Sequence, residues 1–197
     1  MSISAAVVKE LREKTGAGMM ECKKALVEVD GDIDKAVDYL RTKGIAKAAK
    51  RAGKATAEGI VNSYIHPGGG VGVLIEVNCE TDFVARTDEF QAFVRDIAMH
   101  IAATNPAAIS ADEIDDLVLA KEREIYLAQA AEEGKPAEIA AKIVEGRMSK
   151  YRKENALLDQ PFVRNPDETV GELLKSKIAS LGENIIIKRF ARFSISD

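Results

Sequence analysis

The feature that most constrains the fold is a pair of alternating apolar segments joined by a run of turn residues. Residues 58–78, EGIVNSYIHPGGGVGVLIEVN, alternate apolar and polar positions on both sides of Pro67-Gly70. Alternation with period two is typical of half-buried strands, and a short glycine-rich break between two such runs is typical of a hairpin. If this four-residue loop sets the register, His66 faces Val71. One face of the hairpin then carries Ile60, Tyr64, Val73, Ile75 and Val77, and we expect this face to be the core side.

Helical patterns flank this hairpin on both sides. Residues 3–43 predict three short helices, interrupted at TGAG and at Asp30-Gly31. After the hairpin, FQAFVRDIAMHIAA places Phe90, Phe93, Val94, Ile97 and Ile101 at helical spacing. Further helices are predicted at about 111–133, 136–156 and 168–181, and residues 184–195 predict a last strand.

These elements together predict an α+β fold. We expect an N-terminal three-helix module at 1–43, a basic linker helix at 44–57, and an α+β core domain at 58–197. The core domain is predicted to contain a small antiparallel three-stranded sheet packed with helices. About 40 residues make a small core for independent folding, so contact with the rest of the chain is expected to help the N-terminal module.

Charge and cysteine content exclude several classes of function. The chain has 28 basic and 32 acidic residues, so there is no overall attraction to nucleic acid. No window approaches the roughly 18 apolar residues of a membrane span, and the N-terminus becomes charged too soon for a signal peptide. Two cysteines do not make a disulfide framework, which fits a reducing cytoplasm. No CxxC, HExxH or GxxxxGK[ST] motif is present, so neither a metal site nor nucleotide hydrolysis by this chain is expected.

The segment from Arg41 to Ala57 contains six basic residues and no acidic one. Lys43, Lys47, Lys50 and Lys54 share a helical face. This pattern fits either a phosphate-binding stripe or a solvated linker helix. We favour the linker helix, because isolated charge runs are usually just exposed to solvent, and because no aromatic side chains are interleaved to stack on bases.

The stretch NCETDFVAR, residues 78–86, places a thiol and two carboxylates where the second strand of the hairpin ends. In the expected register, Cys79 lies on the order of 26 Å from His66, too far for a catalytic dyad. Core packing is the better interpretation for Cys79 and for His100. Glu80 and Asp82 fit an acid–base pair or a divalent-ion site, but Thr81 or Asp82 fits equally well as the cap of the next helical turn.

Phe83 allows two interpretations. It precedes Phe90 by seven residues and would join the core stripe of an unbroken helix, which composition favours. Thr87-Asp88 resembles a new N-cap, however, and would set 82–86 apart so that Phe83 projects outward as an interface anchor. Met19 and Met20 are similarly ambiguous, because adjacent residues point in different directions and both cannot easily be core. These residues indicate a binding protein.

Three segments carry a resemblance to a known family: LREKTGAGMMECKKAL at 11–26, NCETDFVAR at 78–86 and GENIIIKRFARF at 182–193. They resemble bacterial elongation factor Ts, in its short form without the long coiled-coil insertion. The resemblance implies a guanine-nucleotide exchange factor for elongation factor Tu, with no covalent chemistry, no cofactor of its own, and no direct binding to nucleic acid or membrane. It also implies that 1–43 is similar to a ubiquitin-associated domain.

The resemblance assigns roles to particular residues. Arg12, Met19 and Met20 correspond to contacts with the GTPase. Thr81, Asp82, Phe83 and Val84 correspond to the exchange motif, in which the aromatic enters between helices of the GTPase and the carboxylate disturbs its magnesium ion. The alternative function is a ubiquitin-associated-like adaptor that binds another partner without exchange activity.

The last strand also predicts self-association. Its apolar residues fall on both faces, and a small open sheet leaves edges that need cover. The short form of the family resembles a longer protein that has lost half of a sheet-on-sheet core. We therefore expect a homodimer or a two-plus-two complex with the GTPase.

Overall fold

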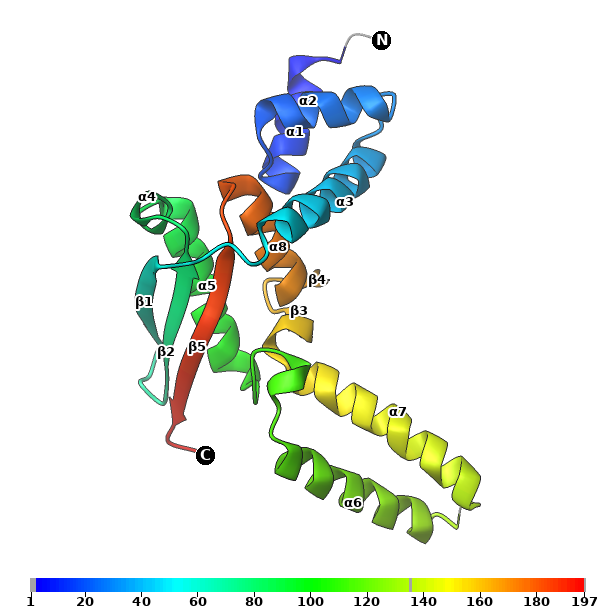
Figure 1. Ribbon diagram of the computed structural model, residues 1–197. Coiled ribbons are helices and arrows are strands. Elements are labelled where there is room, and N and C mark those ends of the chain that lie inside the picture. The colour runs from blue at the N-terminus through cyan, green and yellow to red at the C-terminus, as the bar shows by residue number, and fades with distance from the viewer. Residues whose placement is uncertain (1–2, 135, 197) are drawn as a thin grey trace. The chain divides into compact units, whose positions relative to one another are not determined.

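The computed structural model describes residues 3–134 and 136–196, and in them it confirms an α+β fold (Figure 1). The chain forms two compact units. The first comprises the chain as far as Val61 together with Glu76–Val94 and Glu172–Lys188. The second comprises Asn62–Ile75, Arg95–Gly171 and the chain from Arg189 onward. The predicted boundaries at 43/44 and 57/58 stay a prediction.

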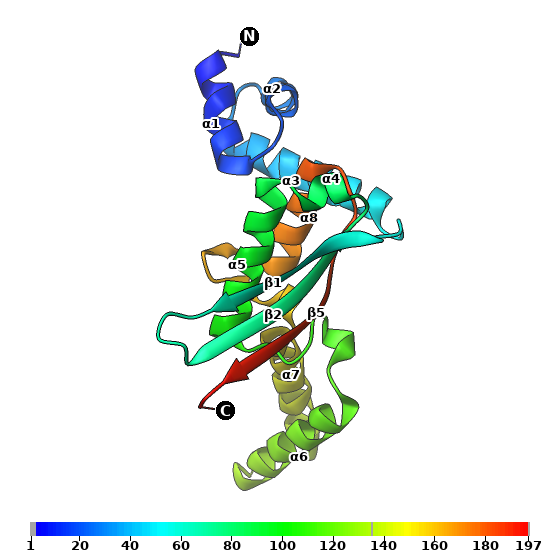
Figure 2. The ribbon, with the colours of Figure 1, turned by 90° about the vertical axis from the view of Figure 1, so that its left-hand side faces the viewer.

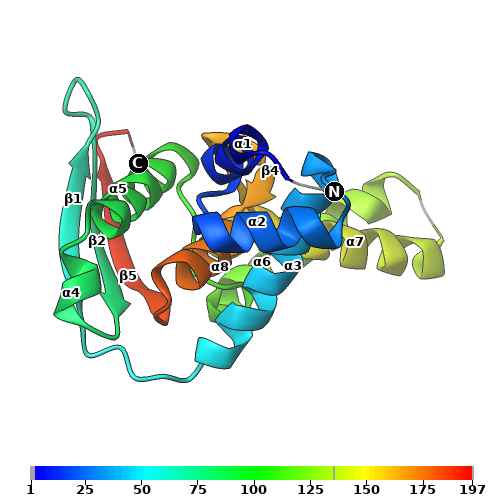
Figure 3. The same ribbon diagram turned by 90° about the horizontal axis from the view of Figure 1, so that it is seen from above.

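Three helices open the first unit: α1 (Ala5–Thr15), α2 (Met19–Glu28) and α3 (Ile33–Arg51) (Figure 3). Helix α1 ends at Gly16, whose φ of 67° is the left-handed conformation that glycine adopts at low cost. The three helices share a small apolar core made of Val8, Leu11, Cys22, Ala25, Leu26 and Ala36. The first part of the basic linker is helical as the continuation of α3, which ends at Arg51, and residues 52–57 lead to the first strand.

The predicted hairpin is present as β1 (Glu58–Ile65) and β2 (Val71–Cys79), and β5 (Ile185–Ser194) completes a sheet in the order β1-β2-β5 (Figure 2). The His66 N–H donates to the Val71 carbonyl at 2.9 Å, which confirms the expected register. The Ile195 N–H donates to the Gly70 carbonyl at 3.0 Å, so β5 ends where β2 begins and the two are antiparallel. On the predicted core face, Val73, Ile75 and Val77 are buried, whereas Ile60 and Tyr64 are half-buried.

After β2 the chain makes a single helical turn, α4 (Asp82–Ala85), and then the longer α5 (Asp88–Thr104). The Thr87 hydroxyl accepts the Phe90 N–H at 3.2 Å, which confirms the new N-cap predicted at Thr87-Asp88. The five apolar residues of the predicted stripe in α5 are all buried. In the first unit, α8 (Val170–Leu181) ends at Gly182, as predicted, and leads into β5.

The second unit contains an antiparallel pair of helices, α6 (Asp116–Glu132) and α7 (Ala137–Asn155), which pack through Ala130, Val144 and Met148 (Figure 1). The helix expected from residue 111 begins only at Asp116, after a short 3-10 turn, η1 (Ala111–Glu113). Two further strands were not predicted: β3 (Pro161–Phe162) and β4 (Asn165–Thr169), which pair with each other. The first is too short and the second too polar to show an alternating pattern.

Candidate functional site

The residues of the predicted exchange motif lie on the turn that follows β2. Thr81 is the N-cap of α4, and its hydroxyl accepts the Val84 N–H at 3.4 Å. The Arg86 N–H donates to the Asp82 carbonyl at 3.1 Å and closes the turn. These bonds confirm the capping interpretation of Thr81. A helix of one turn is unstable alone because its nucleation cost is not recovered, so its position depends on bonds to the rest of the chain.

Phe83 projects into solvent from this turn. Its side chain is 80% exposed, while Phe90 seven residues later is fully buried. The core position that composition favoured for Phe83 is therefore wrong, and the outward alternative is correct. The physical reason is the break at Thr87, which separates α4 from α5 and takes Phe83 out of the apolar stripe. Ala85 is the residue of α4 that is buried.

The two carboxylates beside Phe83 do not act as a pair in the structure. Asp82 forms an ion pair with Arg86 at 2.8 Å, four residues along the chain. Glu80 instead points to the loop before β5, where it accepts the Asn184 N–H at 2.7 Å. Among the described residues, no group of three or more His, Cys, Asp or Glu side chains is placed to hold a metal ion.

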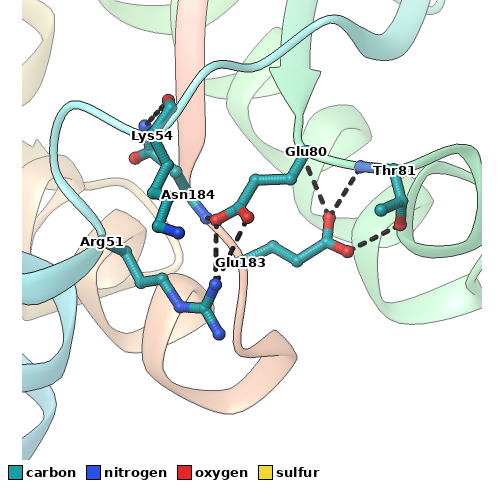
Figure 4. Close-up of polar contacts among 6 residues, drawn as sticks. All are labelled: Arg51, Lys54, Glu80, Thr81, Glu183 and Asn184. Carbon is teal, nitrogen blue, oxygen red and sulfur yellow. Dashed lines mark hydrogen bonds and ion pairs between the residues drawn. The ribbon is translucent and has the colours of Figure 1, made fainter.

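Two carboxylates hold the turn, and each accepts bonds from the loop that carries the other (Figure 4). We call this arrangement of residues 80–81 and 183–184 the Glu80–Glu183 clamp. Glu183 accepts the Glu80 N–H at 3.1 Å, the Thr81 N–H at 3.0 Å and the Thr81 hydroxyl at 2.6 Å. Glu80 accepts the Asn184 N–H and also bonds to Arg51 at 3.3 Å. The Asn184 side-chain amide donates to the Lys54 carbonyl at 2.9 Å. The loops at 80–81 and 183–184 are thus fixed against each other.

The basic segment at 41–57 has contacts within the chain at four of its six basic residues. Arg41 pairs with Glu172, Lys47 pairs with Glu21, and Arg51 pairs with Glu80. Lys43 lies 4.4 Å from the ring centroid of Tyr39. These contacts favour the structural interpretation of the segment over a phosphate-binding stripe, because a paired cation is less available to a phosphate.

Cys79 and His100 are both buried, as expected for core residues. Burial raises the pKa of the Cys79 thiol, and the Glu183 carboxylate adds to this shift, so the thiolate is disfavoured. Burial also lowers the pKa of His100. His100 Nδ1 accepts the Val163 N–H at 3.2 Å, so Nε2 carries the proton and donates to Gln160 at 2.9 Å. Neither residue has the environment of a nucleophile or a base.

The predicted partner contacts lie in the three-helix module. Arg12 is exposed in the last turn of α1, and Met19 and Met20 begin α2 with exposed fractions of 45% and 66%. Their flexible apolar side chains are available to adapt to the surface of a partner. Their role in binding stays a prediction.

Sequence reasoning missed two residues that position the site. Glu183 contacts residues about 100 positions earlier in the chain, and Arg51 was read only as part of a charge run. The available signal for Glu183 was its place directly after Gly182, in a segment that the family resemblance had already marked.

The fold and the site define a class of protein: a small α+β protein with an exposed aromatic on an anchored turn. A family model described as Elongation factor TS matches residues 3–197. The chain is 60% identical to Elongation factor Ts of Alkaliphilus metalliredigens over 197 residues, covering 100% of this chain and 91% of that protein. It is 61% identical to Elongation factor Ts of Thermoanaerobacter sp. strain X514 over 191 residues, covering 97% of this chain and 94% of that protein. The chain therefore belongs to the elongation factor Ts family and is a translation elongation factor.

No helix in the described part of the chain combines the length and the apolar character of a membrane span.

Proposed function

We propose that this protein is a guanine-nucleotide exchange factor that binds elongation factor Tu in its GDP form and promotes release of the GDP. Family membership supports the choice of partner. The observation that carries the proposal is the exposure of Phe83 on a turn held by the Glu80–Glu183 clamp. An exposed phenylalanine is available to a partner, and burying it there is worth about 1.5–3 kcal/mol.

The proposed mechanism is displacement by binding. A GTPase holds GDP through backbone amides at the phosphates and through a magnesium ion that bridges protein and nucleotide. Phe83 enters between helices of the GTPase, and Asp82 brings a negative charge toward the surroundings of that ion. The conformation that accepts Phe83 binds GDP more weakly, and by thermodynamic linkage GDP weakens the binding of this protein by the same factor. No covalent step is required of this chain.

The three-helix module supplies affinity in this proposal. Arg12, Met19 and Met20 contact the GTPase, while Thr81, Asp82, Phe83 and Val84 drive release. Docking and displacement thus depend on different elements of the chain, α1–α2 and α4. This separation predicts that substitutions in α1 or α2 weaken binding to the GTPase, and that substitutions in α4 slow GDP release.

We further propose that the protein self-associates in the cytoplasm as a homodimer or as a two-plus-two complex. Support comes from an apolar surface in the second unit, where Ile65, Leu74, Phe193 and Ile195 are exposed around a hollow of about 390 Å³. Phe193 is 72% exposed and Ile195 is 90% exposed. A second copy of the chain would cover this surface.

The direct test is release of labelled GDP from elongation factor Tu. Adding this protein should accelerate GDP release, and the release rate should approach a maximum as the concentration of this protein rises. If the GDP release rate is unchanged at every concentration of this protein, the exchange proposal fails; if the protein also does not bind the GTPase, the result favours the adaptor alternative, which binds another partner.

A further inference from the structure

The position of Phe83 depends on bonds that come from outside its own turn. Helix α4 is four residues long, and its local bonds include the Arg86 N–H to Asp82 carbonyl and the Ala85 N–H to Thr81 carbonyl, at 3.1 and 3.3 Å, and the cap of the Val84 N–H by the Thr81 hydroxyl at 3.4 Å. Local bonds of this kind do not fix a single turn in water. The Glu183 carboxylate supplies three further acceptor contacts, all to Glu80 and Thr81, at the start of the turn.

The Glu183 contacts differ from those that join the helices of the same unit. Glu89 of α5 accepts bonds from Lys177 and Ser180 of α8 at 3.0 and 2.8 Å, and so connects these two helices directly. Glu183 makes its contacts with the N-cap residue of α4 and the residue before it. Its loss removes bonds from the turn while the α5–α8 connection stays in place.

The number and direction of the donors favour a carboxylate at this position. Two backbone N–H groups and one hydroxyl point to the two oxygens of Glu183. A glutamine has one acceptor oxygen, so it can accept the two N–H groups only as a neutral acceptor, with its NH₂ group facing the Thr81 hydroxyl, which can then no longer donate to it. Bonds to a charged acceptor are also about twice as strong as neutral ones.

We infer that Glu183 is a positioning residue for the exchange turn: it holds the N-terminal end of α4 so that Phe83 and Asp82 are presented in one fixed orientation. Glu80 completes the arrangement from the other side, because its carboxylate binds the Asn184 N–H and Arg51 and so fixes the loop that carries Glu183. The expected effect of Glu183 on nucleotide release rests on the proposed function, whereas its expected effect on the order of the turn is independent of that function.

The test uses Glu183→Gln, with Glu89→Gln as a matched control that removes a carboxylate from the same unit. Hydrogen exchange of the Ala85 and Arg86 amides reports the order of the turn. GDP release from elongation factor Tu is measured at half-saturating and at saturating concentrations. We expect Glu183→Gln to reduce amide protection and the saturating release rate by about tenfold, because one bond to a charged acceptor is worth about that factor. Glu89→Gln should leave both unchanged.

A second pair of variants covers the case in which Glu183→Gln lowers the melting temperature. Thr81→Val removes both the bond that the hydroxyl donates to Glu183 and its cap on the Val84 N–H, whereas Thr81→Ser keeps both. The serine variant should retain wild-type protection and the valine variant should not. In a Phe83→Ala background, Glu183→Gln should change the saturating rate by less than about twofold, because two residues that act through one contact are not additive.

Two results would overturn the inference. One is wild-type protection of Ala85 and Arg86 in Glu183→Gln. The other is lost protection with a wild-type saturating rate, which would show that the orientation of the turn is irrelevant to release. If the unmodified protein does not accelerate GDP release, the proposed function fails, and amide protection alone then decides whether Glu183 holds the turn.

Discussion

Phe83 and Phe90 are the same residue type seven positions apart, yet one is 80% exposed and the other is fully buried. At the scale of single residues, the difference comes from the hydroxyl of Thr87, which starts a new helix between them. The sequence contained this signal, but a seven-residue spacing suggested one continuous stripe. The sequence therefore allowed the outward position of Phe83 as one of two interpretations, and the structure decides between them.

The contrast gives a prediction for stability. Phe90→Ala should lower the free energy of unfolding by about 3–5 kcal/mol, as truncation of a buried phenylalanine does. Phe83→Ala should change it by less than about 0.5 kcal/mol, because an exposed side chain loses little burial. Urea denaturation of both variants checks this. Equal losses would show that Phe83 is buried in the free protein.

His100 predicts a pH dependence of stability. Its Nδ1 must stay unprotonated to accept the Val163 N–H, and the ring lies against Phe162 with centroids 5.9 Å apart. Burial lowers its folded-state pKa below the ordinary value of 6.5. Asp96, one turn before His100 in α5, and Arg164, next to Val163, pair with each other at 2.6 Å.

The sign of the effect follows from proton binding. Between the lowered folded pKa and 6.5, the unfolded chain binds a proton at His100 that the folded chain does not, so stability falls as the pH drops through this window. Thermal unfolding at pH 7.5 and 5.5 should show a larger loss for the unmodified protein than for His100→Gln. Identical losses in the two proteins would show that His100 does not cause the pH dependence.

At the scale of elements, the helices and the sheet could be predicted because their patterns are local. The apolar stripe of α5 and the alternation in β1 and β2 each lie within one segment. The clamp joins residues 80–81 with 183–184, and no local pattern reports a contact across about 100 residues. The short strands β3 and β4 were missed because their pairing, not their composition, defines them.

Helix α2 carries the prediction for docking. Truncating Met19 and Met20 together to alanine should raise the concentration needed for half-maximal GDP release by about tenfold, a typical loss at interface anchors, while the maximal rate is retained. Val27→Ala is the control, because Val27 is also exposed on α2. The melting temperature should be unchanged in both variants. A lower maximal rate with unchanged half-saturation would contradict the division between docking and release.

For the complete chain, we predict self-association through the apolar surface of the second unit. Sedimentation equilibrium at micromolar concentration should give about twice the chain mass of 21.3 kDa. Phe193→Asp should return the protein to a monomer, since a buried unpaired carboxylate is costly. Val163→Asp, at another exposed apolar residue of the same unit, should not. A single species near 21.3 kDa for the unmodified protein would refute the dimer.

The central claim is that Phe83 drives nucleotide release from an otherwise intact protein. The most direct measurement is the rate of labelled GDP release from elongation factor Tu at saturating concentrations of the unmodified protein, of Phe83→Ala, and of Leu117→Ala. Leu117 is the matched control because it is also 80% exposed. We expect a release rate for Phe83→Ala at least about tenfold below that of the unmodified protein, at an unchanged melting temperature. Leu117→Ala should match the unmodified protein. If folded Phe83→Ala gives the same GDP release rate as the unmodified protein, Phe83 does not drive release.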